Sequence, residues 1–370
     1  MYKTNMSEIK NSLTKRFGIL TAGGDCPGLN AAIRGVCNTA YYHYSMEIVG
    51  IAEGFRGLIE EKHRFLNPID FTDILTKGGT ILGTSREKPF RSQFAQINEI
   101  AEEKVLTIKE NYEKLDLDCL VVLGGNGTNT TCSRLTRQGI NIISLPKTID
   151  NDIVGTDRCI GFSSALATGT EAIDRLQSTA QSHSRVIVIE LMGHKAGWLA
   201  LYAGIAGGGD IILIPEIPYD IKAIGRHLEN RAKSGKTFSV VVAAEGALSI
   251  AESVMEKQER KKHQIGKGPS AAYRIAKEIY EETGMETRAT VLGYVQRGGI
   301  PSAQDRVLAS RLGKASADLL AKGEYGRMTA IVGNEITSVE LSVPEGKTKT
   351  VPRNHYLIDT AIAIGTCIGV

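Results

Sequence analysis

Short runs of apolar, mostly β-branched residues alternate with longer helix-like segments along most of this 370-residue chain. The runs are continuously apolar rather than alternating, which is typical of strands buried on both faces of a parallel sheet. We expect strands at 16–22, 47–53, 118–125, 140–146, 185–191, 210–216, 238–245, 289–295 and 328–333, and helices at 29–42, 163–181, 221–233 and 304–321. Repeated strand–helix–strand units with right-handed crossovers follow from this order. The pattern predicts an α/β fold with mainly parallel sheets.

Length and composition indicate a two-domain globular protein. A chain of 370 residues exceeds the usual single core, and 42% hydrophobic residues are enough to fill two. A formal net charge of only +3 implies no nucleic-acid-binding surface, and we interpret the basic run from Gln258 to Gly268 as a solvated surface loop. The six cysteines form no CxxC pair, and no apolar run suits a secretory signal or a membrane span. We therefore expect a soluble, cytoplasmic protein without a membrane partner.

Glycine-rich turns follow two of the expected strands. The letters GGD stand at 23–25 and GGNGT at 124–128, where a helix start is expected. Ligands of open parallel sheets bind at the carboxyl ends of strands, and small residues there let a phosphate approach backbone N–H groups. One such turn is equally well a packing device, and neither G-x-x-x-x-G-K-[ST] nor G-x-G-x-x-G is present. Two of them together favour a phosphorylated ligand.

A cluster of charged residues follows the next strand, in the stretch SLPKTIDND from Ser144 to Asp152. A solvated turn is the simplest reading of two acids this close together. Beside two phosphate-binding turns, however, Asp150 and Asp152 have the chemistry of a general base and a magnesium ligand, and Lys147 adds a cation. This is the equipment of phosphoryl transfer.

Seven motifs in order carry a family resemblance: GGDCPGLNAAIRG, GTSR, LGGNGT, PKTIDND, MGHKAGWLA, AAEG and ATVLGYVQRGGIPSAQDR. From about Phe17 to about Gly323 the chain closely resembles the 6-phosphofructokinases, and PKTIDND with QRGG is highly specific. The resemblance implies the phosphofructokinase fold of two Rossmann-like three-layer domains. It also implies the glycolytic transfer of a phosphoryl group to the 1-hydroxyl of fructose 6-phosphate, giving fructose 1,6-bisphosphate.

The resemblance also implies the domain limits. An N-terminal extension covers 1–16, the donor-binding domain 17–161 plus about 296–346, and the fructose 6-phosphate-binding domain 162–295. A C-terminal extension covers 347–370. The active site is expected in the cleft between the domains. The segment from about Leu248 to Ser270 is longer than in the compact bacterial enzymes of the family, and its role is left open.

By resemblance, five residues carry the chemistry. Asp150 accepts the proton of the sugar hydroxyl, and Thr148 hydrogen-bonds near the transferred group. Asp152 helps to hold the magnesium complex and orients the base. Arg86 bridges the two phosphorylated substrates and offsets charge that develops in the transition state. Lys147 is a further cation beside the departing phosphate.

The sugar-phosphate site is also assigned by resemblance. Arg185, Arg288 and Arg297 match binders of the 6-phosphate, and the first two come from the neighbouring subunit in the family. We therefore expect a homo-oligomer, a dimer or tetramer with shared active sites. Glu245 matches the acid that hydrogen-bonds sugar hydroxyls. The substrate-binding set also includes Thr148, Asp150, Asp152, Met192, Gly193, His194 and Tyr294, although His194 replaces a common arginine and Tyr294 a common histidine.

The phosphoryl donor and its metal depend on the glycine turns. The expected nucleotide-binding residues are Gly24, Arg86, Gly125, Asn126, Gly127 and Thr128. Magnesium is expected on Asn126 and Asp152, with weakened binding because Asn126 replaces the usual aspartate. Gly127 leaves room for ATP, whereas pyrophosphate-dependent members carry an aspartate there; Lys147 is instead typical of pyrophosphate enzymes. An aspartate at 127 would exclude ATP, whereas a lysine at 147 only adds attraction for the departing phosphate. Gly127 is therefore the stronger indication, and we predict ATP as co-substrate.

Three alternatives remain open at this point. The first is the same reaction with pyrophosphate as donor, which Lys147 favours. The second is a catalytically weak or regulatory homologue, suggested by Asn126, although such a protein need not keep Asp150, Asp152, Arg86 and Thr148 together. The third is another α/β kinase with a GGNGT-type turn, such as a diacylglycerol or NAD kinase, but these lack PKTIDND and QRGG.

Overall fold

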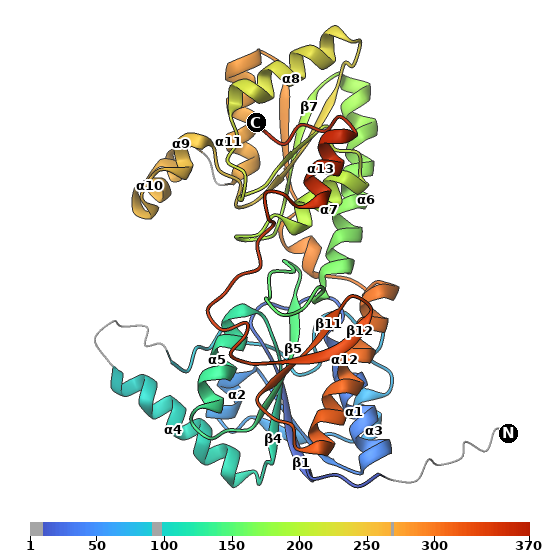
Figure 1. Ribbon diagram of the computed structural model, residues 1–370, viewed down its shortest axis with the longest axis vertical. Coiled ribbons are helices and arrows are strands. Elements are labelled where there is room, and N and C mark those ends of the chain that lie inside the picture. The colour runs from blue at the N-terminus through green and yellow to red at the C-terminus, as the bar shows by residue number, and fades with distance from the viewer. Residues whose placement is uncertain (1–9, 91–97, 268–269) are drawn as a thin grey trace, which may run out of the picture. The chain divides into compact units, whose positions relative to one another are not determined.

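The structure is a computed structural model that describes residues 10–90, 98–267 and 270–370 (Figure 1). These residues form two compact units. Unit 1 contains the described residues up to Thr148 together with 153–163 and 297–348. Unit 2 contains 149–152, 164–296 and 349–370. The chain therefore passes between the units more than once.

Unit 1 is built on an eight-stranded sheet with the order β12-β11-β5-β4-β1-β2-β3, in which β6 also pairs with β5. The strands are β1 (Arg16–Ala22), β2 (Glu47–Ile51), β3 (His63–Phe65), β4 (Cys119–Gly124), β5 (Ile142–Thr148), β6 (Ile160–Gly161), β11 (Arg327–Val332) and β12 (Glu335–Glu340). Only the edge strands β3 and β12 pair antiparallel with their neighbours. The expectation of an α/β fold with mainly parallel sheets is confirmed here.

Helices flank this sheet and bury its apolar residues. They are α1 (Leu29–Tyr44), α2 (Phe55–Ile59), α3 (Pro68–Phe71), α4 (Asn98–Lys114), α5 (Asn126–Thr136) and α12 (Ala303–Lys322). Helices α1 and α12 pack closely through two glycines: a Cβ on Gly313 would lie 2.7 Å from the backbone nitrogen of Val36, and one on Gly35 would lie 3.1 Å from Ser310 Cα. Larger side chains would push the two helices apart.

Unit 2 contains a parallel four-stranded sheet with the order β10-β7-β9-β8 (Figure 1). Its strands are β7 (Val186–Leu191), β8 (Ile211–Leu213), β9 (Ser239–Ala244) and β10 (Thr287–Val291). Its helices are α6 (Phe162–His183), α7 (Trp198–Ala206), α8 (Ile221–Lys233), α9 (Ile250–Ser253), α10 (Lys257–Lys267), α11 (Ala271–Thr283) and α13 (Tyr356–Ala363). Strands β7 and β9 are buried at every residue, as their continuous apolar sequences predict.

The strand expected at 289–295 is wrong in its second half. Strand β10 ends at Val291, and the 3-10 helix η1 spans Gly293–Arg297. Gly293 has a φ of +50°, a conformation that other residues rarely adopt and that ends the extended strand. Strand β10 also lies at the sheet edge and is only partly buried, so the apolar run is shared between two elements.

The loop expected for the basic run is also wrong, because helix α10 covers Lys257–Lys267. Gly268, at the end of that run, lies outside the described residues. Lysine, glutamine, glutamate and arginine are good helix formers, and they occupy most positions of this segment. Helix propensity therefore decides the local structure where the polar composition had suggested a loop.

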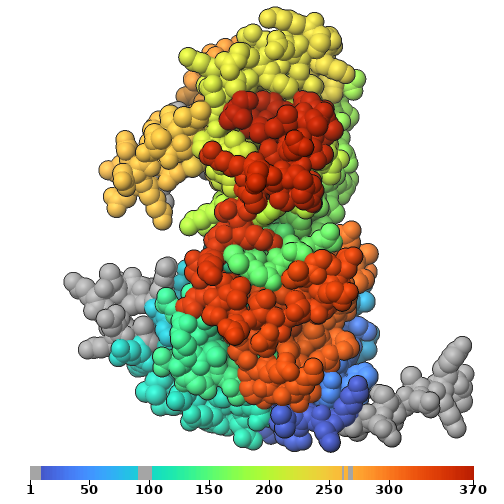
Figure 2. Space-filling view, viewed as in Figure 1, coloured from blue at the N-terminus to red at the C-terminus, as the bar shows by residue number. Residues whose placement is uncertain are grey.

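The two ends of the described chain are fixed by backbone contacts. The N–H of Leu13 donates to Ala321 O (2.9 Å) in unit 1. In unit 2, the N–H of Ile212 donates to Cys367 O (2.9 Å), and Figure 2 shows the C-terminal residues covering part of the surface of that unit. Residues 349–370 are thus an integral part of unit 2.

All six cysteines are free thiols, and five of them are buried, as expected for small apolar side chains. Within the described ranges, no helix is both long enough and apolar enough to cross a bilayer.

Candidate functional site

Three of the predicted segments meet at one edge of the sheet in unit 1. Strands β5, β4 and β1 are neighbours and run parallel, so their carboxyl ends lie side by side. Gly23 and Gly24 follow β1, Gly125 follows β4, and Lys147 and Thr148 end β5. Strand order therefore gathers the two glycine turns and the start of the charged cluster at one place.

Lys147 is fixed against the first glycine turn. Its side chain is only 4% exposed, and its Nζ donates to Gly24 O at 2.5 Å. Gly23 has a φ of +87°, which explains the glycine, and a Cβ there would lie 3.7 Å from the same Nζ. The ammonium group is thereby held at the carboxyl end of the sheet rather than in solvent.

The GTSR segment is joined to the same turn. Ser85 forms a bridge with Ala22, the last residue of β1, and accepts a hydrogen bond from Gly23 N (2.8 Å). The hydroxyl of Thr84 donates to Gly23 O (2.7 Å). Arg86, the next residue, is exposed. These contacts hold Thr84 and Ser85 against the first glycine turn, so the backbone of Arg86 starts beside that turn.

Arg297 also lies in this unit, against Gly24. A Cβ added to Gly24 would collide with the guanidinium group of Arg297, so a larger residue would require the arginine to move. The sequence assigned Arg297 to the sugar phosphate and Gly24 to the nucleotide. The structure brings these two residues together in unit 1.

The second glycine turn is the N-terminal end of α5. Gly125 is the N-cap and Asn126 the first helical residue, two positions before the expected start at Thr128. A Cβ on Gly124 would collide with the Thr128 side chain, whereas one on Gly127 would meet no atom within 4 Å. Gly127 also has no positive φ. The packing of this chain explains Gly124 but gives no reason for a glycine at 127.

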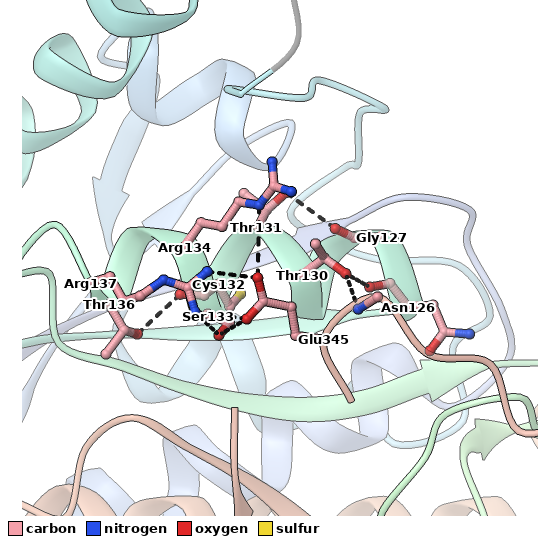
Figure 3. Close-up of polar contacts among 11 residues, drawn as sticks. Asn126, Gly127, Thr130, Thr131, Cys132, Ser133, Arg134, Thr136, Arg137 and Glu345 are labelled. Atoms are coloured by element: carbon pink, nitrogen blue, oxygen red, sulfur yellow. Dashed lines mark hydrogen bonds and ion pairs between the residues drawn. The ribbon is translucent and has the colours of Figure 1, made fainter. Parts of the chain in front are cut away.

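Helix α5 is held by a residue that sequence reasoning did not single out (Figure 3). Glu345 accepts hydrogen bonds from both terminal nitrogens of Arg137 (2.8 and 2.6 Å) and from the hydroxyl of Ser133 (2.7 Å). These bonds hold the pKa of Glu345 at about 2, Arg137 contributing most. The next residue, Gly346, donates its N–H to Thr130 Oγ1 (3.2 Å), which donates to Asn126 O (3.0 Å).

The turn after β5 carries the predicted acids. Thr148 pairs with Gly161 of β6 and belongs to unit 1, whereas Ile149–Asp152 group with unit 2. Asn151 has a φ of +52°, which turns the chain sharply. Asp152 is 7% exposed, and its backbone carbonyl accepts the N–H of Lys349 (2.7 Å). The PKTIDND segment is thus a tightly turned connection rather than an extended loop.

Unit 2 contains a cavity of about 410 Å³ that brings three predicted sugar-binding residues together. Met192, Glu245 and Tyr294 line it, and so do Glu190, Ser270 and Tyr273. The N–H of His194 donates to Glu245 Oε1 (2.7 Å). Gly193 has a φ of +148°, and a Cβ there would lie 2.6 Å from Ala196 O, so only glycine fits this turn.

Arg185 and Arg288 do not line this cavity. Arg185 precedes β7, whereas the cavity lies at Leu191, the last residue of that strand, about 20 Å away at the usual rise per residue. Arg288 is paired with Ile187, near the same far end of β7. Glu286 bridges the two arginines, with Arg185 Nε at 2.9 Å and Arg288 Nη2 at 2.5 Å. The hydrogen bond from Arg185 and, after it, the charge of both arginines lower the pKa of Glu286.

Comparison with known proteins identifies the family of this chain. The family model described as Phosphofructokinase matches residues 16–320. The chain belongs to the phosphofructokinase family. The ATP-dependent 6-phosphofructokinase of Spirochaeta thermophila is 61% identical over 98% of this chain and 99% of its own. ATP-dependent 6-phosphofructokinase 3 of Bacteroides thetaiotaomicron is 50% identical over 96% of this chain and all of its own.

Solved phosphofructokinase structures share the fold. Phosphofructokinase from Pichia pastoris in the T-state superposes with a TM-score of 0.78 at 30% identity, covering 95% of this chain and 37% of that one. The pyrophosphate-dependent phosphofructokinase from Marinobacter aquaeolei superposes with a TM-score of 0.77 at 23% identity, covering 96% and 88%. The predicted family and fold class are both confirmed.

Asn126 and Asp152, the predicted metal ligands, both carry oxygen donors of the kind that magnesium accepts. Among the described residues, no group of three or more His, Cys, Asp or Glu side chains could hold a metal by itself. Magnesium commonly needs only one or two protein oxygens, because substrate phosphates and waters complete its shell. The Asn126 amide and the Asp152 carboxylate are oxygen donors of this kind. A preformed all-protein cage is not required.

Sequence reasoning missed Glu190, Tyr273 and Glu345. Glu190 had a usable signal, because a carboxylate near the end of the apolar run VIVIEL falls where ligands bind. Tyr273 and Glu345 had none, since a tyrosine in an amphipathic helix and a glutamate in a loop are ordinary surface residues. Only the packing of α11 and α5 reveals their positions.

Proposed function

We propose that this chain catalyses phosphoryl transfer from ATP to the 1-hydroxyl of fructose 6-phosphate, giving ADP and fructose 1,6-bisphosphate. The relatives at 61% and 50% identity are named ATP-dependent 6-phosphofructokinases, and both align over nearly their whole length. The observation that carries the proposal is the edge of the unit 1 sheet, where β1, β4 and β5 bring two glycine turns and Lys147 together. This reaction belongs to glycolysis.

We propose that Asp150 is the general base. Its carboxylate accepts the proton of the sugar 1-hydroxyl as the oxygen attacks the γ-phosphorus of ATP and the bond to the β-phosphate oxygen breaks. Thr148 donates a hydrogen bond to the transferred group, and Arg86 and Lys147 offset its negative charge. Asp152 orients the base. The buried position of Lys147 supports its role, because a cation in a desolvated site acts more strongly than one in water.

The nucleotide is proposed to bind at the glycine turns. Gly24 and Gly125 allow close approach of phosphates to the backbone, and the N-terminal end of α5 at Asn126 favours negative charge. The open space at Gly127 supports ATP as donor, because the absent side chain leaves room for a ligand rather than for this chain. Thr128 completes the turn.

Magnesium, when bound, would neutralise phosphate charge and orient the donor for in-line transfer. We assign the protein oxygens that hold it to Asn126 and Asp152. A neutral amide at 126 supplies less attraction than a carboxylate, so much of the metal's coordination falls to the nucleotide phosphates and water.

The sugar phosphate is proposed to occupy the cavity of unit 2. Glu245 accepts hydrogen bonds from sugar hydroxyls, and the turn through Met192, Gly193 and His194 forms a wall. Tyr294 closes another side, and Arg297 contributes a cation to the 6-phosphate.

A homo-oligomer with shared active sites is part of the proposal. Arg185 precedes β7 and lies at the opposite end of that strand from the cavity, and Arg288 of β10 is not among the residues that line the cavity, which supports a role for both arginines outside the site of their own chain. Two arginines held by one carboxylate at a strand start suit a dianion bound by a neighbouring subunit. We also propose a cytoplasmic enzyme, without nucleic acid or membrane partners.

One assay tests the reaction and the donor. Fructose 1,6-bisphosphate formation is measured with magnesium and either ATP or pyrophosphate at equal concentration. We expect turnover with ATP and little with pyrophosphate. Faster turnover with pyrophosphate would contradict the donor assignment, and no product with either donor would contradict the proposed reaction.

A further inference from the structure

The sugar cavity of unit 2 has a wall that its assigned residues do not explain. Two residues at the start of α11 also line the cavity: Ser270, the N-cap, and Tyr273, in the first turn. Tyr273 keeps 51% of its surface exposed although it belongs to a helix that packs on the sheet. A half-exposed tyrosine at a ligand cavity presents both an apolar ring and a hydroxyl to whatever binds there.

The first turn of α11 is fixed to the sheet by Glu190. This residue lies next to the end of β7, is 7% exposed, and lines the cavity itself. Its Oε2 accepts the backbone N–H of Ala272 at 2.8 Å. The first amides of a helix have no partner within the helix, so a carboxylate from a neighbouring strand both satisfies one and holds the helix end in place.

The described part of the inserted segment, residues 248–267, is fixed to the same turn. Glu252 of α9 is 1% exposed, and its Oε1 lies 3.5 Å from Nε of Arg274, which is 6% exposed and adjacent to Tyr273. Gln264 of α10 donates to the same Glu252 oxygen at 3.3 Å. Separating a buried ion pair is costly, because each charge would be left buried without its partner. This contact therefore holds the insertion against α11.

We propose that Tyr273 is a further sugar-contacting residue of the phosphofructokinase site and that residues 248–267 position it through the Glu252–Arg274 pair. The ligand class is a phosphorylated ketose, whose hydroxyls and C–H faces match a tyrosine hydroxyl and ring. The inference rests on the proposed function, because it takes the cavity to be the sugar site.

The test compares two tyrosines of one helix. Tyr280 lies two turns after Tyr273 in α11, is 57% exposed, and is not among the residues lining the cavity. We expect Tyr273→Ala to raise the half-saturating concentration of fructose 6-phosphate by about tenfold, as for the loss of one good contact, while that of ATP stays unchanged. Tyr280→Ala should leave both unchanged.

The outcomes separate this inference from the proposed function. If the wild-type enzyme phosphorylates fructose 6-phosphate but Tyr273→Ala behaves like Tyr280→Ala, the inference is wrong and the function stands. If the wild-type enzyme neither binds nor phosphorylates fructose 6-phosphate, the proposed function fails and this inference with it. Calorimetric titration of the nucleotide-free protein with fructose 6-phosphate supplies the binding measurement.

The positioning role of the insertion has its own variant. Glu252→Gln keeps the side-chain shape but removes the charge that holds Arg274. We expect a several-fold rise in the half-saturating concentration of fructose 6-phosphate with that of ATP unchanged, since α11 lies in unit 2. Equal changes for both substrates, together with a lower melting temperature, would indicate a merely structural pair and overturn this part of the inference.

Discussion

Replacing Asp150 and replacing Arg185 should impair different kinetic constants of the enzyme. Asp150→Ser removes the proton acceptor at the 1-hydroxyl but leaves every contact to the 6-phosphate, so it should lower kcat by about 100-fold or more and leave the half-saturating fructose 6-phosphate concentration nearly unchanged. Arg185→Ser removes a phosphate contact and should mainly raise that concentration. Steady-state kinetics on both variants are the measurement. Equal loss of kcat in the two would contradict the separate roles.

Gly127 decides between donors, and its surroundings make it a clean position to change. A Cβ added there would meet no atom within 4 Å, so we expect Gly127→Asp to fold normally, with an unchanged melting temperature. Its carboxylate would repel the α-phosphate of ATP and occupy the nucleoside's space, so we expect ATP-dependent turnover to be lost. A variant that keeps ATP use would show that the steric argument is wrong.

Asn126 tests the metal assignment. Asn126→Asp replaces a neutral oxygen donor with a charged one at the N-terminal end of α5, where negative charge is also favoured by the helix dipole. We expect half-maximal activity at a several-fold lower magnesium concentration. Magnesium titration of the variant at fixed ATP is the measurement, and an unchanged dependence would remove this position from the metal site.

At the level of single elements, Glu345 links the C-terminal part of unit 1 to α5, the helix that begins at the donor turn. Its pKa is lowered, so its contribution to stability is present above the ordinary carboxyl range and is lost as the pH falls from about 4.5 toward 2. Allowing for solvent screening of the exposed Arg137, we expect Glu345→Gln to reduce the free energy of unfolding by roughly 1 kcal/mol at pH 7.

Denaturant unfolding at pH 7 and near pH 2.5 measures this effect. Wild type and Glu345→Gln should differ at pH 7 and approach each other at the lower pH. Glu335→Gln, an exposed residue at the start of β12, is the control and should match wild type at both. A difference that persists unchanged at low pH would mean that the ionised carboxylate is not its source.

Elements marked by a continuous apolar run that ends where the strand ends could be predicted from the sequence. Elements whose composition pointed to a different structure could not. The apolar runs of β1, β4, β7 and β9 fixed their positions, because strands buried on both faces admit few polar residues. Helix α10 was missed because its sequence is almost entirely polar, and the single large apolar side chain, Ile265, forms no helical apolar stripe. The run beginning at Ala289 was misjudged because Gly293, rather than a change in hydrophobicity, ends the strand.

At the scale of the whole molecule, the candidate site could be predicted only where chain order and sheet order coincide. The turns after β1, β4 and β5 meet because those strands are neighbours. Contacts such as Arg297 against Gly24 join positions 273 residues apart (297 − 24) and leave no local pattern. Nothing in the local sequence around Arg185 shows that it lies a full strand length from the cavity; the position of the cavity at the end of β7 does.

The position of these arginines leads to a test of shared active sites. Asp150→Ser and Arg185→Ser chains are each inactive or weak alone at low fructose 6-phosphate concentration. If each site combines Asp150 of one subunit with Arg185 of another, a mixed dimer contains one site in which both residues are wild type. Random mixing of equal amounts should then restore about a quarter of wild-type activity, since half of the dimers are mixed and half of their sites are intact. The chains are mixed under denaturing conditions, refolded together and assayed, with separately refolded chains combined afterwards as the control. Activity equal to the sum of the two parents would mean that Arg185 serves the site of its own chain, and the far end of β7 would then need another explanation.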